Sequence, residues 1–446
     1  MTRDDHSRRV TSPPSWARGW LSDSSNLLAS QVLTVIATSV AAIMIARTLD
    51  PGDWGVFSAF LGLSIALALV ADFGLGTWLL RELSRLVAGA DERASERAGR
   101  LLSAGIVVNT VVALPLLVAA LAWSAVAQPG ADVTVALVSL LVYGALTATA
   151  NVLETHLRAH RRVRLVLAAS LIEKGVLLVL LVAVVAANLG LAAIGLSYVV
   201  AGLTRIAFDA TVVFVRDGVP HAIPATNEVR DVARASLPFA FNAASFNLVP
   251  RLDTLVLLTL SATSAGWFAI GDRVLGPALL VPATLGATLY PFMAGRAAKE
   301  VPPWKLAGAI GAAGVALAAV GILLAPFLIP LLFGDAYEES VPVAQIMLLV
   351  VPLIYAASPL LVIAYSHGRE RSLLVPILAL SLAGTVAIVV GQMVGGPTLA
   401  AAGYVARSAL FLAVIGIVAF VAWRRHTAST TADEVASPGP VSAQAQ

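Results

Sequence analysis

The sequence predicts an all-α integral membrane protein with about twelve transmembrane helices in two halves of six. Three observations support this fold class. Of the 446 residues, 59% are apolar and only 12% are charged, and the mean hydropathy is +0.88, whereas about 25% of the residues of a soluble domain are charged. The apolar residues form long segments. Lys and Arg occur in alternate connections between these segments.

Each apolar segment is long enough to cross a bilayer as a helix. The hydrocarbon core is about 30 Å thick, a distance that a helix covers in about 20 residues. Cutting the chain at its polar interruptions gives twelve segments of about this length or longer. They cover residues 26–46, 54–80, 101–126, 133–153, 165–187, 191–215, 237–260, 267–292, 306–333, 341–365, 373–395 and 399–423.

The connections between the segments predict the orientation of the chain. Those without Lys or Arg cover residues 50–53, 127–132, 188–190, 261–265, 334–340 and 396–398. The alternate connections and both chain ends are basic. Because basic connections remain on the cytoplasmic side of a membrane protein, we expect a multi-pass protein of the plasma (cytoplasmic) membrane with both termini in the cytoplasm.

The longer basic connection in the middle divides the segments into two sets of six. We expect a cytoplasmic N-terminal segment at 1–23, an N-terminal six-helix lobe at 24–215, a cytoplasmic linker at 216–236, a C-terminal six-helix lobe at 237–423 and a disordered cytoplasmic tail at 424–446. A weak internal repeat aligns residues 53–59 with 264–270 at an offset of 211. Two such halves would be related by an axis along the membrane normal, with a substrate path between them.

Proline is distributed unevenly between the two halves. Within the predicted spans of the first half only Pro115 occurs, whereas those of the second half contain Pro238, Pro250, Pro277, Pro282, Pro291, Pro326, Pro330, Pro352, Pro359 and Pro376. Because proline removes a helical hydrogen bond, we expect kinked or broken helices there. Such a helix is a plausible gate, although many membrane prolines only shape packing.

Twelve charged residues lie within the predicted spans or at their edges. The bases are Arg47, Lys174, Arg205, Arg251, Arg273 and Arg407, and the acids are Asp72, Glu154, Glu173, Asp209, Asp253 and Asp272. A central base costs about 2.5 to 3.5 kcal/mol on the insertion scale. These groups must therefore pair, extend to the headgroups, or line a water-filled cavity.

Spacing along the chain separates some of these cases. Residues four apart share a helix face, so we expect Arg205 to pair with Asp209 and Glu154 with Arg158. Arg47, at the outer end of its span, can reach the headgroups. Asp72 has no base three or four positions away, so it needs a partner on another helix or a proton.

The remaining embedded charges have no expected partner within one helical turn. Arg251 and Asp253 lie at a depth similar to that of Asp272 and Arg273 on the returning span, and pairing across these helices is possible. Lys174 and Arg407 are also not paired within a turn. Cations that face a central cavity would suit a phosphate or diphosphate, because Arg offers a forked, permanently charged donor set. The alternative is a buried ion-pair network that holds the helices in register.

The sequence argues against an enzyme. Cysteine is absent, so no disulfide, thiol nucleophile or cysteine-bound metal is expected. No Walker A motif, zinc-type His cluster or nucleophile elbow is present, and the connections are too short for a folded catalytic domain. We expect no cofactor and no metal. The net charge of +3 reflects membrane orientation, so no nucleic-acid partner is expected.

Short motifs in a fixed order identify a family resemblance. They are ARTLDPGDWGVFS at 46–58, ADFGLG at 71–76, LREL at 80–83, PRLDTL at 250–255, AGWFA at 265–269 and LFGDAY at 332–337. With these motifs the chain resembles the polysaccharide (oligosaccharide) flippases of the multidrug/oligosaccharidyl-lipid/polysaccharide exporter superfamily. Each motif is short and apolar, so their order and placement carry the resemblance.

The resemblance implies two six-helix lobes around a central cavity that opens alternately to either side. The implied substrate is an oligosaccharide joined through diphosphate to a polyprenyl lipid, moved from the cytoplasmic to the outer leaflet for polysaccharide biosynthesis. Glycosyltransferases and a polysaccharide polymerase are then possible partners, beside the membrane lipids. The implied substrate-binding cations are Arg47, Arg251 and Arg273, then Lys174, Arg205 and Arg407. Asp72 and Asp253 are the implied groups for proton or sodium coupling.

Two other functions remain open at this point. A cation-coupled small-molecule antiporter of the same fold would have an acidic rather than a cationic cavity. A non-transporting membrane scaffold of a glycan synthesis complex would have all embedded charges paired and no open cavity.

Overall fold

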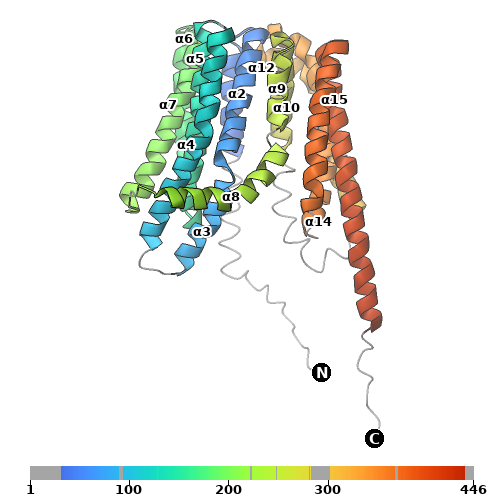
Figure 1. Ribbon diagram of the computed structural model, residues 1–446. Helices are drawn as coiled ribbons and strands as arrows, with labels where there is room; N and C mark the ends of the chain where they lie inside the picture. The colour runs from blue at the N-terminus through green and yellow to red at the C-terminus, as the bar shows by residue number, and fades with distance from the viewer. Residues whose placement is uncertain are drawn as a thin grey trace, which may run out of the picture.

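The computed structural model describes residues 32–89, 94–127, 129–220, 223–247, 249–280, 282, 302–366 and 370–436. These residues form helices and turns without a strand. Eight of the helices in this part of the chain are long and apolar enough to cross a membrane. Most helices run side by side in one bundle (Figure 1). The predicted fold class, an all-α multi-pass membrane protein, is confirmed.

The N-terminal half is built around one central helix. Its elements are the helix Val32–Ala46, then α2 (Pro51–Asp72), α3 (Leu75–Gly89), α4 (Ala94–Ala127), α5 (Ala131–Ala159), α6 (Val163–Ala186) and α7 (Gly190–Ala210), which continues as the π-helix η1 (Thr211–Arg216). α5 packs against α2, α4 and α7. It therefore holds this half together.

The C-terminal half contains shorter and more interrupted helices. Its elements are α8 (Thr226–Asn247), the 3-10 helix η2 (Val249–Leu252), α9 (Asp253–Leu258), α10 (Ala262–Ala278), α12 (Pro303–Phe333), the 3-10 helix η4 (Asp335–Ser340), α13 (Val341–Leu348), α14 (Val350–Ser366) and α15 (Glu370–Ala436). α15 comprises two helices, because the backbone leaves the helical region at Gly395 and Gly396. Gly396 has φ 72°, a value that favours glycine.

The six connections predicted to face outward all coincide with helix ends. For example, α9 ends at Leu258 and α10 begins at Ala262, while α12 ends at Phe333 and η4 follows. The first connection shows the local cause: the side chain of Asp50 accepts a hydrogen bond from the backbone N–H of Asp53 at 2.8 Å. Proline follows at the first helical position, where its missing N–H costs nothing. The side of the membrane that these turns face stays a prediction.

Large apolar side chains cover the outside of the bundle. On α12, Leu323, Phe327 and Leu331 are exposed by 71%, 73% and 65%, and they lie four residues apart on one helix face. A stripe of this kind is unfavourable in water but favourable against lipid tails. The exposed surface thus agrees with a membrane-embedded bundle.

At least three predicted spans comprise more than one helix, among them span 341–365, which comprises α13 and α14. The break in span 54–80 corrects the sequence-based segmentation, whereas broken helices were expected in the proline-rich second half. Span 54–80 is broken where α2 ends at Asp72 and α3 begins at Leu75, with Phe73 and Gly74 at φ 47° and 72°. Span 237–260 comprises the end of α8, then η2 and α9. α8 lies across the end of the bundle before the chain turns upward (Figure 1). Apolar composition alone does not distinguish a broken span from a continuous one.

The prolines of the second half coincide with several of these irregularities. Pro250 lies in the 3-10 helix η2. Pro277, Pro326, Pro330, Pro359 and Pro376 lie inside helices of the second half, and Pro291 lies outside the described residues. Gating at any of these prolines stays a prediction.

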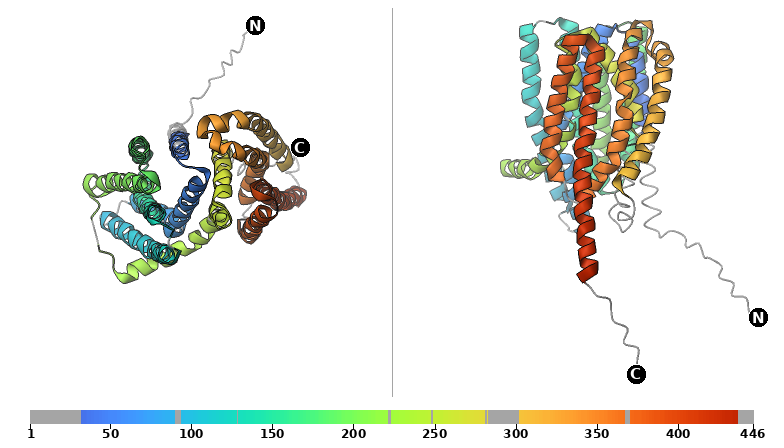
Figure 2. Two further views of the ribbon diagram at one scale, coloured as in Figure 1. Left: turned by 90° about the horizontal axis from the view of Figure 1, so that it is seen from above. Right: turned by 90° about the vertical axis from the view of Figure 1, so that its right-hand side faces the viewer.

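The two halves meet through α2. Seen from above, early and late helices form two groups with the yellow-green α10 segment between them (Figure 2). α2 packs against α5 on one side and against η2, α9 and α10 on the other. Its apolar core is continuous with residues of α10 and α12, including Ile270 and Ile329. This contact is consistent with two lobes, although the domain boundaries remain a prediction.

Candidate functional site

A polar cavity of about 230 Å³ lies where the two halves meet. α2 contributes Ser58, Leu61, Gly62 and Ile65, and the opposite wall comes from η2, α9, α10 and α15. That wall carries charge: Arg251, Asp253, Asp272 and Arg273 all line the cavity. The sequence placed these four residues at similar depth, and the structure brings them together.

Arg251 and Arg273, the cations of the cavity lining, form no ion pair with a carboxylate in the described part of the chain. Arg251 is exposed and lies on η2. The backbone of η2 lies directly against α2: a Cβ atom added at Gly62 would be only 2.8 Å from the Arg251 carbonyl oxygen. Arg273 is half-buried, and its guanidinium carbon lies 5.9 Å from the ring centroid of Trp54. This distance allows a cation–π contact. Both cations thus rest on α2 while their charge remains available to the cavity.

Asp253 and Arg407 form a buried ion pair at 2.7 Å between α9 and α15. They are 1% and 7% exposed. Thr385 donates a hydrogen bond to Asp253 at 2.8 Å, and the Arg407 guanidinium lies 4.6 Å from the ring centroid of Tyr404. Each charge is therefore held by the other. Neither Arg407 as a substrate cation nor Asp253 as a coupling group is free in this arrangement.

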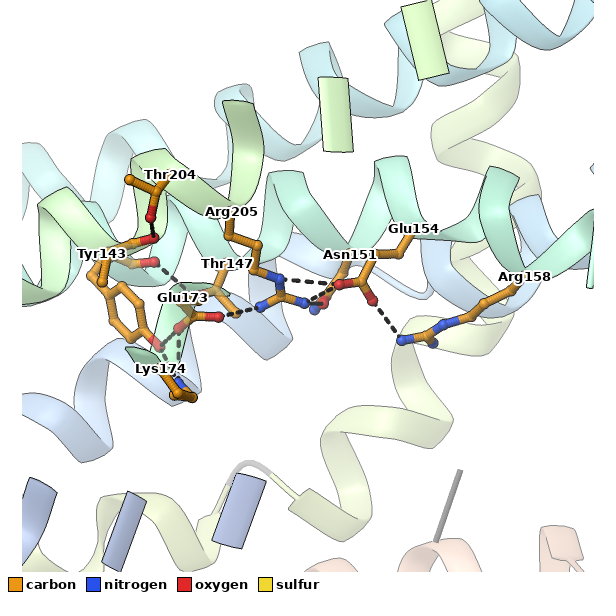
Figure 3. Close-up of polar contacts among 10 residues, drawn as sticks. Tyr143, Thr147, Asn151, Glu154, Arg158, Glu173, Lys174, Thr204 and Arg205 are labelled. Atoms are coloured by element: carbon orange, nitrogen blue, oxygen red, sulfur yellow. Dashed lines mark hydrogen bonds and ion pairs between the residues drawn. The ribbon is translucent and has the colours of Figure 1, made fainter. Parts of the chain in front are cut away.

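A second charged cluster lies inside the N-terminal half, between α5, α6 and α7 (Figure 3). Arg205 bridges two carboxylates, with guanidinium nitrogens 2.6 Å from Glu154 and 3.2 Å from Glu173. Lys174 lies 2.8 Å from Glu173. The hydroxyl of Tyr143 also donates to Glu173, at 2.7 Å. Lys174 and Arg205 are thus neutralised inside the lobe, as expected for a buried ion-pair network that holds the helices in register.

The cluster corrects two expectations from spacing, that Arg205 pairs with Asp209 and that Lys174 is unpaired within a turn, and it confirms a third. Arg205 pairs with Glu154 and Glu173 on other helices, not with Asp209. Lys174 pairs with its neighbour Glu173, because two long flexible side chains can fold toward one another. Glu154 pairs with Arg158 at 2.8 Å as predicted.

Asp209 is the residue that the spacing argument misjudged most. It is 0% exposed, and neither carboxylate oxygen has a hydrogen-bond partner among the described residues. An ionised carboxylate in such a place is costly. The sequence does contain the alternative partners of Arg205, because Glu154 and Glu173 lie in the predicted spans of the same half.

Arg47 lies outside the cavity lining and joins the two halves near the turns predicted to face outward. Its Nε donates to the carbonyl of Leu332 at 2.8 Å and its Nη2 donates to the carbonyl of Leu331. These carbonyls end α12, where a cation is favourable. In return, Tyr337 donates from its hydroxyl to the carbonyls of Ala46 and Leu49 at 2.9 and 3.0 Å. The sequence did not single out Tyr337.

Asp72 finds its partner in the backbone. Its carboxylate accepts a hydrogen bond from the N–H of Gly76 at 3.2 Å. This arrangement satisfies one free N–H at the start of α3. The helix break after Asp72 thus provides the partner that the sequence analysis sought on another helix.

The N-terminal ends of α2 and α10 touch backbone to backbone. A Cβ atom added at Gly55 would be 2.0 Å from the carbonyl oxygen of Ala262, and one added at Gly266 would be 1.9 Å from that of Pro51. Gly55 and Gly266 are equivalent in the 211-residue repeat. The helices can therefore approach this closely only because both positions lack a side chain.

Comparisons with known proteins agree on the family and the fold. A family model described as "Polysaccharide biosynthesis protein" matches residues 20–295. No curated protein matches the chain. An inward-facing structure of a multidrug resistance MATE family transporter of the MOP superfamily aligns with TM-score 0.68 and 15% identity, covering 89% of this chain and 95% of that one.

Two further structures widen the comparison. The lipid II flippase MurJ in an inward closed conformation aligns with TM-score 0.70 and 10% identity, covering 87% of this chain and 86% of that one. An outward-facing MATE transporter gives TM-score 0.59 and 14% identity, covering 91% and 96%. The resemblance stated from the motifs is confirmed, and this chain belongs to the polysaccharide biosynthesis protein family, with the fold of MOP-superfamily transporters.

Proposed function

We propose that this protein moves a polyprenyl-diphosphate-linked oligosaccharide from the cytoplasmic to the outer leaflet of the plasma membrane. Transport would proceed by alternating access and without chemical change to the substrate. Both termini would lie in the cytoplasm, and glycosyltransferases and a polymerase would supply and use the lipid-linked sugar. The family assignment to polysaccharide biosynthesis supports this choice among the transport functions of the fold.

The single observation that carries the proposal is the contrast between two groups of embedded cations. Lys174, Arg205 and Arg407 are each held by carboxylates. Arg251 and Arg273 line the cavity between the halves and form no ion pair within the described residues. Two guanidinium groups that face an open polar space suit the oxygens of a diphosphate.

Alternating access is supported by where the halves touch. The Gly55–Gly266 contact, Arg47 and Tyr337 all join the halves near the turns predicted to face outward. We infer that these contacts close the side predicted to face outward. A transport cycle would separate these contacts and expose the cavity to the other side.

A cation-coupled antiporter is the second candidate, and one observation favours it. Asp272 is exposed on the cavity wall, close in sequence to Arg273, and its carboxylate would suit a cationic substrate. The fold comparison includes multidrug transporters. Uptake of a cationic dye that requires Asp272 would support this candidate.

The proposal is tested with the purified chain in vesicles that contain a labelled lipid-linked oligosaccharide. Arg251→Ala and Arg273→Ala should each lower the flipping rate about tenfold or more, since a hydrogen bond to a charged group contributes about 1.5 to 3 kcal/mol. Arg251→Lys and Arg273→Lys should retain part of the rate. Arg164→Ala, an exposed base outside the cavity, is the control. Wild-type rates in both alanine variants would refute the proposal.

A further inference from the structure

A second cavity, of about 570 Å³, lies at the opposite end of the N-terminal half from the Gly55–Gly266 contact. It is lined by the end of α5, the end of η1 and one side of α3 and α4. Two candidate membrane spans, Ala131–Ala159 and Gly190–Arg216, end here. Figure 1 shows this end of the bundle, where α3 and α8 lie. The cavity is therefore at the level where spans leave the hydrocarbon core.

Basic and imidazole groups gather on one wall of this cavity. The lining includes His156, His160, Arg162 and Arg216, together with the single acid Asp217. The rings of His156 and His160 are 4.2 Å apart, and His156 is 3% exposed. The Nδ1 atom of His156 has no hydrogen-bond partner among the described residues. This polar wall is thus only partly satisfied by the protein itself.

Asp217 neutralises one side of the wall and leaves the other side positive. It forms ion pairs with Arg162 and with Nε2 of His156, the latter at 3.2 Å. Burial raises the pKa of the Asp217 carboxyl, but the hydrogen bond and charge of Arg162 outweigh it and hold the pKa below its usual value. Arg216 is exposed and forms no ion pair with the residues that the structure describes. At neutral pH the lining therefore carries a net positive charge.

The opposite wall is apolar. It is formed mainly by Leu83, Leu86 and Val87 of α3 and by Ala94 and Ala98 of α4, with Ser95 as its one polar side chain. A cavity that holds one water needs a volume of about 10 to 15 Å³, so this cavity has room for a much larger group. A ligand with an anionic head and a hydrocarbon body would match both walls. A free anion would leave the apolar wall without a partner.

We propose that this cavity binds the phosphate of an anionic phospholipid headgroup from the adjacent leaflet. Arg216 would contact the phosphate, with the charge of Arg162 on the same wall, while the start of an acyl chain would lie against α3. Basic pockets between spans on the cytoplasmic side bind anionic headgroups in this way. The site is separate from the cavity of Arg251 and Arg273, and it does not depend on the transported substrate.

Native mass spectrometry of the full-length chain, titrated with phosphatidylglycerol, tests the proposal. Arg216→Gln should lower lipid retention about fivefold, as expected for one base near an anionic membrane surface. Asp217→Asn should raise retention, because it removes the only negative charge of the lining. Arg164→Gln is the matched control, since it is an exposed base at the same end that does not line the cavity. Phosphatidylcholine should be retained less than phosphatidylglycerol.

The opposite signs expected for Arg216→Gln and Asp217→Asn separate binding from misfolding, since a folding defect would lower retention in both variants. Equal losses in Arg216→Gln and Arg164→Gln would overturn the proposal in favour of diffuse surface attraction. Inorganic pyrophosphate is the second arm of the test. If pyrophosphate binds in a way that depends on Arg216 while phosphatidylglycerol is not retained, the cavity would be assigned to a soluble phosphate. That result would overturn the lipid site.

Discussion

The contact between Gly55 and Gly266 predicts the effect of a single added methyl group. Gly266→Ala would place a Cβ atom 1.9 Å from the carbonyl oxygen of Pro51, and ordinary contact begins at 3.4 Å. Because the opposing atom belongs to the backbone, no side chain can move aside. The outer ends of α2 and α10 would have to separate by about 1.5 Å, the difference between those two distances.

The magnitude follows from the cost of overpacking. Extra methyl groups in a packed interior cost about 1 to 3 kcal/mol. If this cost falls only on the arrangement in which the outer side is closed, its population relative to the open arrangement falls about 5- to 150-fold. The variant should still fold, because the open arrangement relieves the clash.

Disulfide trapping measures this population directly, since the chain contains no cysteine. A Cβ atom at Gly52 would be 4.0 Å from the Cβ of Ala262, within the usual range of about 3.5 to 4.5 Å for a disulfide. Oxidation of Gly52→Cys/Ala262→Cys should therefore lock the outer side and stop transport until a reductant is added. Adding Gly266→Ala should slow disulfide formation by the same factor.

Gly276→Ala in the same helix provides the control. A Cβ atom there meets no atom of the described residues within 4 Å, so disulfide formation should be unchanged. The reasoning would be refuted if Gly266→Ala left both the rate of disulfide formation and the rate of transport at wild-type values.

Three further predictions concern charged groups. Arg407→Ala should lower the stability by about 3 to 5 kcal/mol, because it leaves buried Asp253 unpaired, and thermal unfolding should show partial recovery in Arg407→Ala/Asp253→Ala. Asp209→Asn should leave the unfolding temperature unchanged or higher, since neither oxygen of Asp209 has a hydrogen-bond partner in the described residues. A marked fall in the unfolding temperature would contradict this. Glu173→Gln, by contrast, should lower the unfolding temperature, because Lys174 and Arg205 lose a partner. Because the pKa of the Asp217 carboxyl is lowered, the pair of Asp217 with Arg162 should stabilise the protein above about pH 4. This stabilisation should be lost as the pH falls through the lowered pKa. Acid titration of Arg162→Gln should show no such loss.

The sequence allowed the helix ends to be predicted more reliably than the side-chain partners. Turns such as 50–53 combine a capping Asp, a Pro and an interruption of the apolar run, and these local signals act within a few residues. The break at Asp72 was missed, because no proline marks it and the surrounding span is apolar. Irregular helices were expected in the second half, where Pro250 lies in η2. Local patterns therefore located the elements and the breaks that proline marks, but not the break after Asp72.

Partner choice depends on contacts between helices that the sequence does not reveal. Spacing found Glu154–Arg158, which share one helix face. It could not find Asp253–Arg407, which are distant in sequence and meet only when α15 packs beside α9. It also assigned Arg205 to the nearest acid along its helix. Distant residues of the cavity were nevertheless grouped correctly, since depth in the membrane follows from position along a span.

One face of α2 connects the outer contact with the cavity cations. Gly55 and Gly62 are seven residues apart, and residues at this spacing lie on the same side of a helix. Gly55 touches α10, and Gly62 touches the carbonyl of Arg251. Between them, Ser58 lines the cavity. A movement that separates α2 from α10 at Gly55 therefore also shifts the surface on which η2 rests, so the position of Arg251 should change whenever the outer side opens. The binding of an anionic headgroup and the closure of the side predicted to face outward would then both depend on the contact between α2 and α10.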